Sequence, residues 1–322
     1  MAKGWRVVLV AALAFAVTAS GEWIYGGHWG SPGSGIGQFY YPYGVAVAPN
    51  GNVYVAEKDN HRIQYFGTTG SYIGQWGSPG TGNGQFVNPK GVAVAPGGDV
   101  YVCDSFNDRI QYFTATGSFL GKWGNSGNGD GQFNRPAGLT ITPAGVVYVA
   151  DQDNHRIQYF TAAGSFLGKW GSPGSGNGQF QNPFSVGVTP AADAVYVSED
   201  NDRIQYFTAT GSYLGRWGSL GSGTGQFNAP RGVAVASGGD VYVADTENDR
   251  VQYFTADGSF LGAWGSEGSA NGQFYSPTGL CFGNTGYRIY VTDAGNHRIQ
   301  YFNWVTTAIV PASLGRVKAL FK

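Results

Sequence analysis

Short stretches of alternating apolar and polar residues, separated by turns, run along most of the chain. Within residues 91–124 they predict four strands, at 91–95 (GVAVA), 99–104 (DVYVCD), 109–113 (RIQYF) and 118–124 (SFLGKWG). The turns between them are rich in Gly, Pro, Asn and Asp, which suit positive or fixed φ angles. The pattern indicates four short antiparallel strands that form one sheet.

This four-stranded unit recurs with a constant step of 47 residues. The tripeptide GQF begins at 37, 84, 131, 178, 225 and 272, and a tryptophan keeps the same step from Trp29 to Trp264. Repeated units of this kind are typical of β-propeller blades. Residues 23–30 match a fourth strand that lacks its first three, and residues 279–302 supply strands one to three. We therefore expect an all-β fold, a six-bladed β-propeller of four-stranded antiparallel blades whose last blade is closed by the N-terminal strand.

Three motifs of the repeat, P-x-G-V-A-V, V-Y-V-A-D and N-H-R-I-Q, resemble the NHL repeat, a family of six-bladed β-propellers. The resemblance covers nearly everything from Trp23 to Phe302. It implies the fold and leaves the function open, because members include secreted scaffolds, RNA- or protein-binding domains and a zinc-dependent lyase. In the lyase members a zinc-binding His follows the Pro of the P-x-G motif in three blades. No blade of this chain has His in that position.

The two ends of the chain depart from the repeat. Residues 1–19 have two basic residues, an apolar run and small residues, which is the form of a secretory signal peptide; a buried helix or a retained anchor is the alternative. We expect the propeller over 20–302 and a protein that is secreted, periplasmic or on the cell surface. Residues 303–322 form a tail with the spacing of a short amphipathic helix, which either docks on the propeller or resembles the sorting tails of some exported bacterial proteins.

The formal net charge of −1 and the two cysteines narrow the classes of partner. A near-neutral chain argues against nucleic acid as the partner, since polyanion-binding domains carry a basic surface. Cys103 and Cys281 fill positions that hold small residues in the other repeats. Because these positions lie in repeats that are not neighbours, we expect no disulfide between them. We expect a monomer.

Each copy of the heptapeptide that begins at Asn60 (NHRIQYF) follows an acidic residue at the end of the second predicted strand. The six acid–arginine pairs are Glu57 and Arg62, Asp104 and Arg109, Asp151 and Arg156, Glu199 and Arg203, Asp245 and Arg250, and Asp293 and Arg298. Opposite charges across a hairpin contribute about 0.2–1 kcal/mol each. Six equivalent copies indicate a structural clasp, whereas catalysis by these pairs would require six equivalent centres.

The four histidines do not predict a metal site. Three of them, His61, His155 and His297, occupy the second position of the heptapeptide, where the other repeats have Asp, and the fourth, His28, lies in the closing strand. Side chains that recur around a ring do not converge on one ion. We expect no metal and no cofactor.

The residue after the Pro of each P-x-G motif is expected at the mouth of the central channel. In chain order these residues are Tyr43, Lys90, Ala137, Phe184, Arg231 and Thr278. Blades three apart face each other, so the series predicts an aromatic pair, a cationic pair and a small pair. Lys90 and Arg231 would hold negative charge and Tyr43 and Phe184 would stack on a planar ligand. The same loops would extend the rim with Tyr40, Tyr41, Arg135 and Tyr275. The alternative is chance variation on an exposed rim.

These observations favour a binding or interaction scaffold without catalytic residues. Its ligand would be another protein, a peptide or a glycan at the channel mouth. The alternative is a propeller enzyme of lyase or hydrolase/lactonase type with an unrecognised metal site, for which the positions after Pro supply no acidic ligands.

Overall fold

The computed structural model describes residues 20–307. The predicted signal peptide at 1–19 and most of the predicted tail, residues 308–322, lie outside the described residues. Within residues 20–307 there is no helix that is long and apolar enough to cross a membrane. Cys103 and Cys281 are free thiols.

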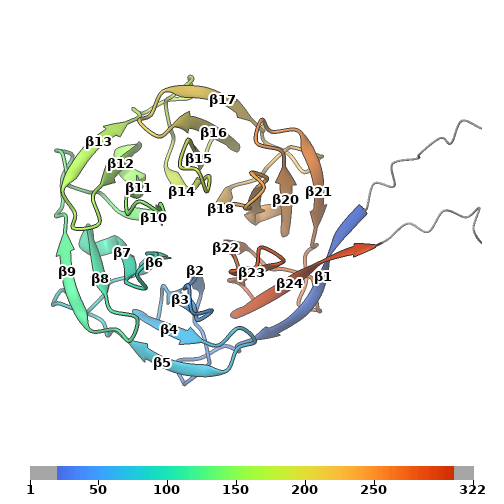
Figure 1. Ribbon diagram of the computed structural model, residues 1–322, viewed down its shortest axis with the longest axis horizontal. Coiled ribbons are helices and arrows are strands. Elements are labelled where there is room, and N and C mark those ends of the chain that lie inside the picture. Colours follow the sequence, from blue (N-terminus) through green and yellow to red (C-terminus); the bar gives the residue numbers. More distant parts are fainter. Residues whose placement is uncertain (1–19, 308–322) are drawn as a thin grey trace, which may run out of the picture. The chain divides into compact units, whose positions relative to one another are not determined.

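Residues 25–303 form a ring of six four-stranded antiparallel sheets (Figure 1), as the repeat predicts. Blades 1 to 3 are β2(Pro42–Val47), β3(Val53–Glu57), β4(Arg62–Phe66) and β5(Tyr72–Trp76); β6(Pro89–Val94), β7(Val100–Asp104), β8(Arg109–Phe113) and β9(Phe119–Trp123); β10(Pro136–Ile141), β11(Val147–Asp151), β12(Arg156–Phe160) and β13(Phe166–Trp170). Blades 4 and 5 are β14(Pro183–Val188), β15(Ala194–Glu199), β16(Arg203–Thr208) and β17(Tyr213–Trp217); β18(Pro230–Val235), β19(Val241–Asp245), β20(Arg250–Phe254) and β21(Phe260–Trp264).

The sixth blade joins the two ends of the chain. It contains β22(Pro277–Phe282), β23(Arg288–Asp293) and β24(Arg298–Thr307), and β1(Ser20–Trp29) supplies its outermost strand. Figure 1 shows the blue β1 running beside the red β24. The expected closure by the N-terminal strand is confirmed, and β24 continues through residues 303–307, which the sequence assigned to the tail.

Burial explains why the second strand of every blade is a run such as VYVAD. All five residues of β3, β7, β11 and β19 are buried, because each blade packs against a neighbour on both of its faces. A strand covered on both faces has no polar side to present, so its sequence does not alternate. The fourth strands, by contrast, alternate between exposed and half-buried residues at the outer edge of the ring.

Aromatic rings fill the space between neighbouring blades. In blade 1 the rings of Tyr54 and Tyr65 stack with centroids 5.3 Å apart, and Trp76 packs against Tyr65 at 5.9 Å. Trp76 also contacts Phe113 of blade 2, with centroids 5.6 Å apart. The hydroxyl of Tyr54 donates a hydrogen bond of 2.8 Å to the carbonyl of Ala115 in blade 2. The blade contact is therefore a packed aromatic core that also carries a polar bond.

The innermost strands approach each other closely because most P-x-G motifs keep their glycine. A Cβ atom on Gly91 would lie 2.7 Å from the carbonyl oxygen of Ala137 in the next blade. Such a contact is far inside the normal distance between nonbonded atoms. The glycine is therefore required by the close backbone contact of blades 2 and 3.

The acid–arginine pairs bind each blade to the connector that precedes it. The six Arg Nε atoms lie 2.5 to 2.7 Å from their carboxylates, and all six carboxylates are fully buried. In blade 2, Arg109 also donates to the carbonyls of Thr81, Gly82 and Gln85, in the connector between β5 and β6. The acid and the arginine lie opposite each other across the hairpin, as the sequence suggests, and they also belong to a buried network that holds the Gly-rich connector.

The second position of the heptapeptide links each blade to the next. In every blade this residue has a positive φ and its side chain accepts a hydrogen bond from the backbone N–H of the following blade. The donor–acceptor pairs are Asn88 and His61, Arg135 and Asp108, Asn182 and His155, Ala229 and Asp202, Ser276 and Asp249, and Tyr41 and His297. His and Asp are interchangeable here because Nδ1 and Oδ1 are both acceptors at similar reach.

Candidate functional site: the mouth of the channel

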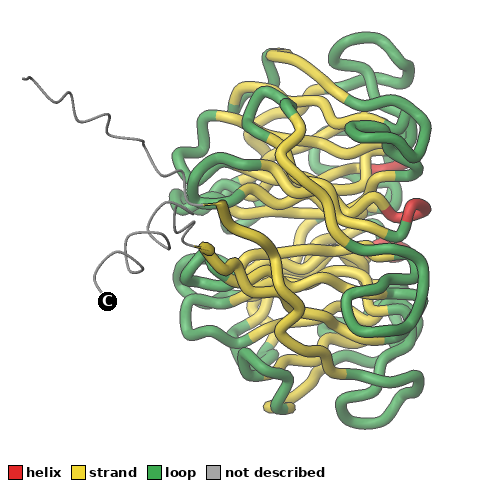
Figure 2. The backbone as a smooth tube through the Cα atoms, turned by 90° about the vertical axis from the view of Figure 1, so that its right-hand side faces the viewer, coloured by secondary structure: helices red, strands yellow, loops and turns green. Residues whose placement is uncertain are grey.

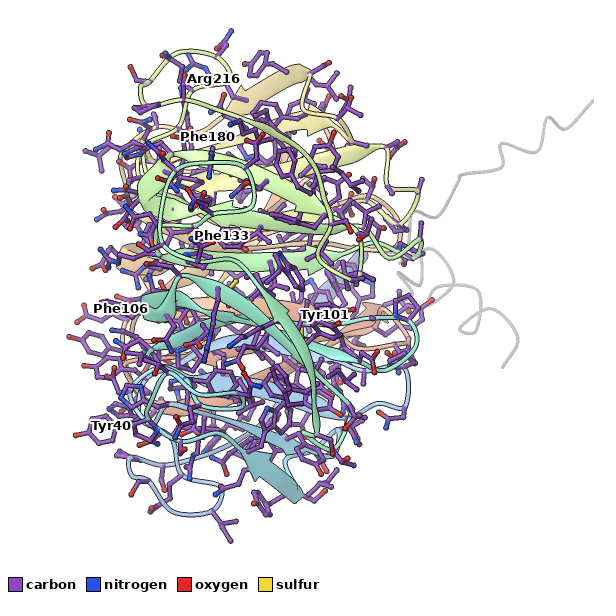
Figure 3. The ribbon with its side chains drawn as sticks, turned by 90° about the vertical axis from the view of Figure 1, so that its left-hand side faces the viewer. Tyr40, Tyr101, Phe106, Phe133, Phe180 and Arg216 are labelled. Carbon is purple, nitrogen blue, oxygen red and sulfur yellow. The ribbon has the colours of Figure 1, made fainter. Side chains whose placement is uncertain are left out.

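Two sets of loops make up one face of the ring. The short 3₁₀ turns η1(Ser105–Asn107), η2(Gln152–Asn154) and η3(Thr246–Asn248), between second and third strands, lie on this face (Figure 2). Each hairpin is bonded to the loop that enters the innermost strand, as in the bond from Phe106 N–H to the carbonyl of Val87. Tyr40, from an entry loop, and Phe106, from η1, project from the same side of the molecule (Figure 3). Binding positions from both loop sets therefore share one surface.

A depression of about 260 Å³, which we call the mouth basin, lies on this face. Its lining residues are Tyr43, Lys58, Asn88, Lys90, Phe106, Arg135, Gln152, Phe184 and Arg231. Five of them are among the eight residues proposed from the sequence. The basin is smaller than the roughly 300–1,000 Å³ of typical small-molecule pockets, so it suits a small group rather than a large ligand.

Arg231 lies at the centre of the aromatic side chains. Its guanidinium carbon is 5.8 Å from the ring centroid of Tyr43 and 5.3 Å from that of Phe184. Both rings thus act as cation–π partners of Arg231, which differs from the expected role of free stacking platforms. Arg231 Nε is buried and has no hydrogen-bond partner among the described residues. Burial raises the pKa of the Tyr43 phenol, against the opposing effect of Arg231.

Lys90 is a nearly inaccessible cation. It is 5% exposed, and its Nζ donates a hydrogen bond of 2.8 Å to Oε1 of Gln152. Its Nζ also lies 5.8 Å from the ring centroid of Tyr43. Burial lowers the pKa of Lys90 to about 8, with a further lowering from the charge of Arg135 and an opposing effect from Asp153. No carboxylate of the described chain lies within ion-pair distance of Lys90.

The other two cations of the basin have acidic neighbours. Arg135 Nη1 is 3.2 Å from a carboxylate oxygen of Asp153, and its guanidinium lies 4.9 Å from the ring centroid of Phe106. Lys58 Nζ is 3.8 Å from an oxygen of Asp59 in an exposed, weak pair. Lys58 and Arg135 therefore form a partly neutralised rim around Lys90 and Arg231.

Three of the residues proposed from the sequence lie outside the basin. Tyr40 and Tyr41 are exposed and pack on His297, with ring centroids 5.2 and 5.0 Å from the imidazole. Tyr275 is exposed beside Gly295, whose backbone N–H donates to the Tyr275 carbonyl. The ring of Tyr41 lies near the basin residue Lys58, whose Nζ is 5.9 Å from the ring centroid.

A second cavity, of about 270 Å³, occupies the central channel and is lined by all six innermost strands. Tyr43, Lys90, Phe184 and Arg231 line both this cavity and the mouth basin, so they stand at the boundary between the two. Ala137 and Thr278, the small pair after Pro, are buried, and they line the channel cavity but not the mouth basin.

Sequence reasoning missed Lys58, Asn88, Phe106 and Gln152. Three of these four follow the acidic residue at the end of the second strand by one or two positions. A comparison of this variable position between repeats would have revealed Lys58, Phe106 and Gln152, because the hairpin lies on the same face as the entry loop. In residues 20–307 there is no group of three or more His, Cys, Asp or Glu side chains that could hold a metal ion.

Comparisons with known proteins support the assignment of the fold. The NHL repeat family matches residues 39–66, 86–113, 133–160, 227–254 and 274–302. Blade 4 is outside these matches, yet it folds into the same four strands. Its hairpin between β15 and β16 is one residue shorter than the corresponding hairpin of the other five blades. No match was found among curated proteins.

Several solved structures share the fold at low sequence identity. A protein of unknown function from Bacteroides thetaiotaomicron is similar with a TM-score of 0.69 and 16% identity, over 89% of this chain and 77% of that protein. A gluconolactonase from Xanthomonas campestris gives a TM-score of 0.62 and 14% identity, over 90% and 99%. A streptogramin B lyase gives 0.59 and 16%, over 89% and 98%. At this identity the likeness concerns the fold alone. Five matched repeats in a closed ring of six blades identify this chain as an NHL-repeat six-bladed β-propeller.

Proposed function

We propose that this propeller is a non-catalytic binding module that holds an anionic part of a protein, peptide or glycan at the mouth basin. The observation that carries the proposal is that two cations of the basin, the buried Lys90 and the half-buried Arg231, have no ion-pair partner in residues 20–307. Uncompensated buried charge is unfavourable for folding, and a bound anion would relieve it.

The composition of the basin lining supports binding over catalysis. Its nine residues are cationic, aromatic or amide side chains, and none of the nine is a carboxylate, histidine or cysteine. General acid–base chemistry commonly uses such groups within hydrogen-bond reach of the substrate. The proposal includes export, which depends on the signal-peptide pattern of residues 1–19, outside the described residues.

A thermal-denaturation panel tests this function. The full chain is heated alone and with acidic glycans, peptides, divalent metal ions and gluconolactone, because a ligand of the folded form raises Tm with the logarithm of its concentration. The same panel is run on the Lys90→Ala/Arg231→Ala variant. The matched control is Lys122→Ala/Arg216→Ala, which removes two exposed cations from the outer strands β9 and β17.

We expect a glycan or peptide to raise Tm in the native chain and the control variant, and not in the Lys90/Arg231 variant. A shift with all three proteins would contradict a site at the mouth. A shift with metal ions alone, or consumption of gluconolactone, would favour the lyase or lactonase alternative.

A further inference from the structure

The charge balance around the mouth basin indicates the valence of its ligand. Four cations, Lys58, Lys90, Arg135 and Arg231, line the basin. The acids that interact with them are Asp59, Asp153 and Asp200. Four cations against three carboxylates leave one uncompensated positive charge. Asp200 lies beyond ion-pair distance of Arg231, and its carboxylate accepts a hydrogen bond of 2.9 Å from the Asn182 amide.

The donors available at the centre of the basin match a carboxylate group. A guanidinium directs its N–H groups outward in its own plane, as a fork that fits two carboxylate oxygens. Rings of Tyr43 and Phe184 pack against Arg231, and its Nε has no acceptor in the described chain. Lys90 has three donor protons, and Gln152 is its one hydrogen-bond acceptor among residues 20–307. Both cations thus retain donors for a shared anion.

We propose that the mouth basin binds a single carboxylate group between the Lys90 ammonium and the Arg231 guanidinium, presented by a small organic acid or by the C-terminus of a peptide. This inference rests on the proposed binding function and deepens it. The volume of about 260 Å³ accommodates the carboxylate and a short adjoining segment. Phe106 and Arg135 at the rim contact whatever extends outward.

Binding of the carboxylate is coupled to the protonation of Lys90. In the empty basin, burial and the neighbouring cations hold the pKa of Lys90 at about 8. A bound carboxylate favours the ammonium form and raises that pKa. At pH 7 the ammonium is already formed, whereas at pH 9.5 binding requires the uptake of a proton. The affinity therefore falls by about tenfold or more between pH 7 and pH 9.5.

The test uses thermal-shift titrations of the full chain at constant ionic strength, at pH 7 and pH 9.5. The probes are acetate, N-acetyl-Ala-Ala with a free C-terminal carboxylate, and the same dipeptide as its C-terminal amide. Acetate and the dipeptide acid distinguish a small acid from a peptide end as the source of the carboxylate. The variants are Lys90→Met and Arg231→Gln, with Lys122→Met and Arg216→Gln as controls of equal charge change.

We expect the acids to bind and the amide not to bind. Lys90→Met weakens binding of the acids by tenfold or more and removes its dependence on pH, whereas the controls leave the affinity within about twofold. Lys90→Met also leaves Tm of the free protein unchanged or raises it, because a buried unpaired charge is replaced by an apolar side chain. Lost binding in this variant is then not a consequence of unfolding.

Equal binding of the acid and the amide, an affinity that is the same at both pH values, or equal losses in the controls would overturn the carboxylate proposal. If these acids do not bind while a panel ligand still requires Lys90 and Arg231, this inference is wrong and the proposed function stands. If no ligand requires these two residues, both are wrong.

Discussion

The backbone N–H of Tyr41 donates a hydrogen bond to Nδ1 of His297, 256 residues away along the chain, at an N···N distance of 3.2 Å. It is one of the bonds that join blade 6 to blade 1, together with the bond from the Tyr290 hydroxyl to the Thr68 carbonyl. These contacts close the ring beyond the pairing of β1 with β24.

The hydrogen bond between Tyr41 and His297 should contribute to the free energy of unfolding. Loss of the acceptor in His297→Ala should destabilise the protein by about 0.5–1.5 kcal/mol at pH 7.5. His297→Asp should retain most of the stability, because Asp108, Asp202 and Asp249 accept the equivalent bond in other blades. Urea unfolding of both variants and the native chain measures the differences. An equal loss of stability in His297→Asp and His297→Ala would contradict a stabilising role of this hydrogen bond.

Acid should weaken the same hydrogen bond, because a protonated Nδ1 of His297 cannot accept a bond from the Tyr41 N–H. Burial lowers the pKa of His297 below its usual 6.5, while Asp59 and Asp293 oppose this effect. A lowered folded-state pKa means that the contribution is complete above about pH 6.5 and is lost as the pH falls through the folded-state value. Unfolding free energies measured between pH 7.5 and 5 should therefore fall more steeply for the native chain than for His297→Asp. Parallel curves would show that His297 makes no contribution.

The buried acid–arginine networks should contribute far more to the stability of the protein than exposed ion pairs do. Arg109→Met leaves the buried carboxylate of Asp104 without its ion-pair partner and frees three connector carbonyls, so we expect a loss of about 3–5 kcal/mol. Lys169→Ala breaks an exposed pair with Asp130 and should change stability by at most about 1 kcal/mol. Chemical denaturation of the two variants decides the matter. Similar small losses of stability in both variants would mean that the buried network does not stabilise the fold.

Two glycines of blade 2 should respond oppositely to a methyl group. Gly91→Ala places a Cβ atom against the backbone of blade 3 and should destabilise the protein by about 1–3 kcal/mol. Gly97→Ala meets no atom within 4 Å and should be within about 1 kcal/mol of the native stability. Thermal unfolding of both variants provides the measurement, and equal shifts would argue against close contact of the inner strands.

The contact of Arg231 with Phe184 should be measurable as a coupling energy. A double-mutant cycle with Arg231→Met and Phe184→Leu isolates the pair, and we expect a coupling of about 0.5–2 kcal/mol for a partly desolvated cation–π contact. Unfolding free energies of the four proteins give the value. Coupling within 0.3 kcal/mol of zero, the usual additivity error, would show that the ring does not stabilise the guanidinium.

The repeat made the fold predictable from sequence. Each blade has the same turn residues and the same small, buried and aromatic strands, so local pattern and blade packing agree six times over. The strands expected at 91–95 and 109–113 differ by no more than two residues at either end from β6 and β8. The orphan strand near Trp29 also predicted the ring closure, because a fourth strand without a blade can pair only with a blade that lacks one.

The candidate site was only partly accessible from sequence. The position after Pro brought Tyr43, Lys90, Phe184 and Arg231 together, since it repeats around a closed ring. Tyr40, Tyr41 and Tyr275 share the entry loops but are exposed outside the basin, because the spacing of residues in a loop does not determine the direction of each side chain.

By itself the sequence determined the blade count, the strand order and the six acid–arginine partners, because each depends on contacts between residues at a fixed spacing along the chain. Tertiary structure alone decided that those pairs are buried, that Arg231 packs against both aromatic rings, and that Lys90 meets Gln152 of the next blade. These properties depend on the reach of each side chain across the channel and on the exclusion of solvent from it. Neither the reach nor the exclusion of solvent follows from the spacing of residues along a strand.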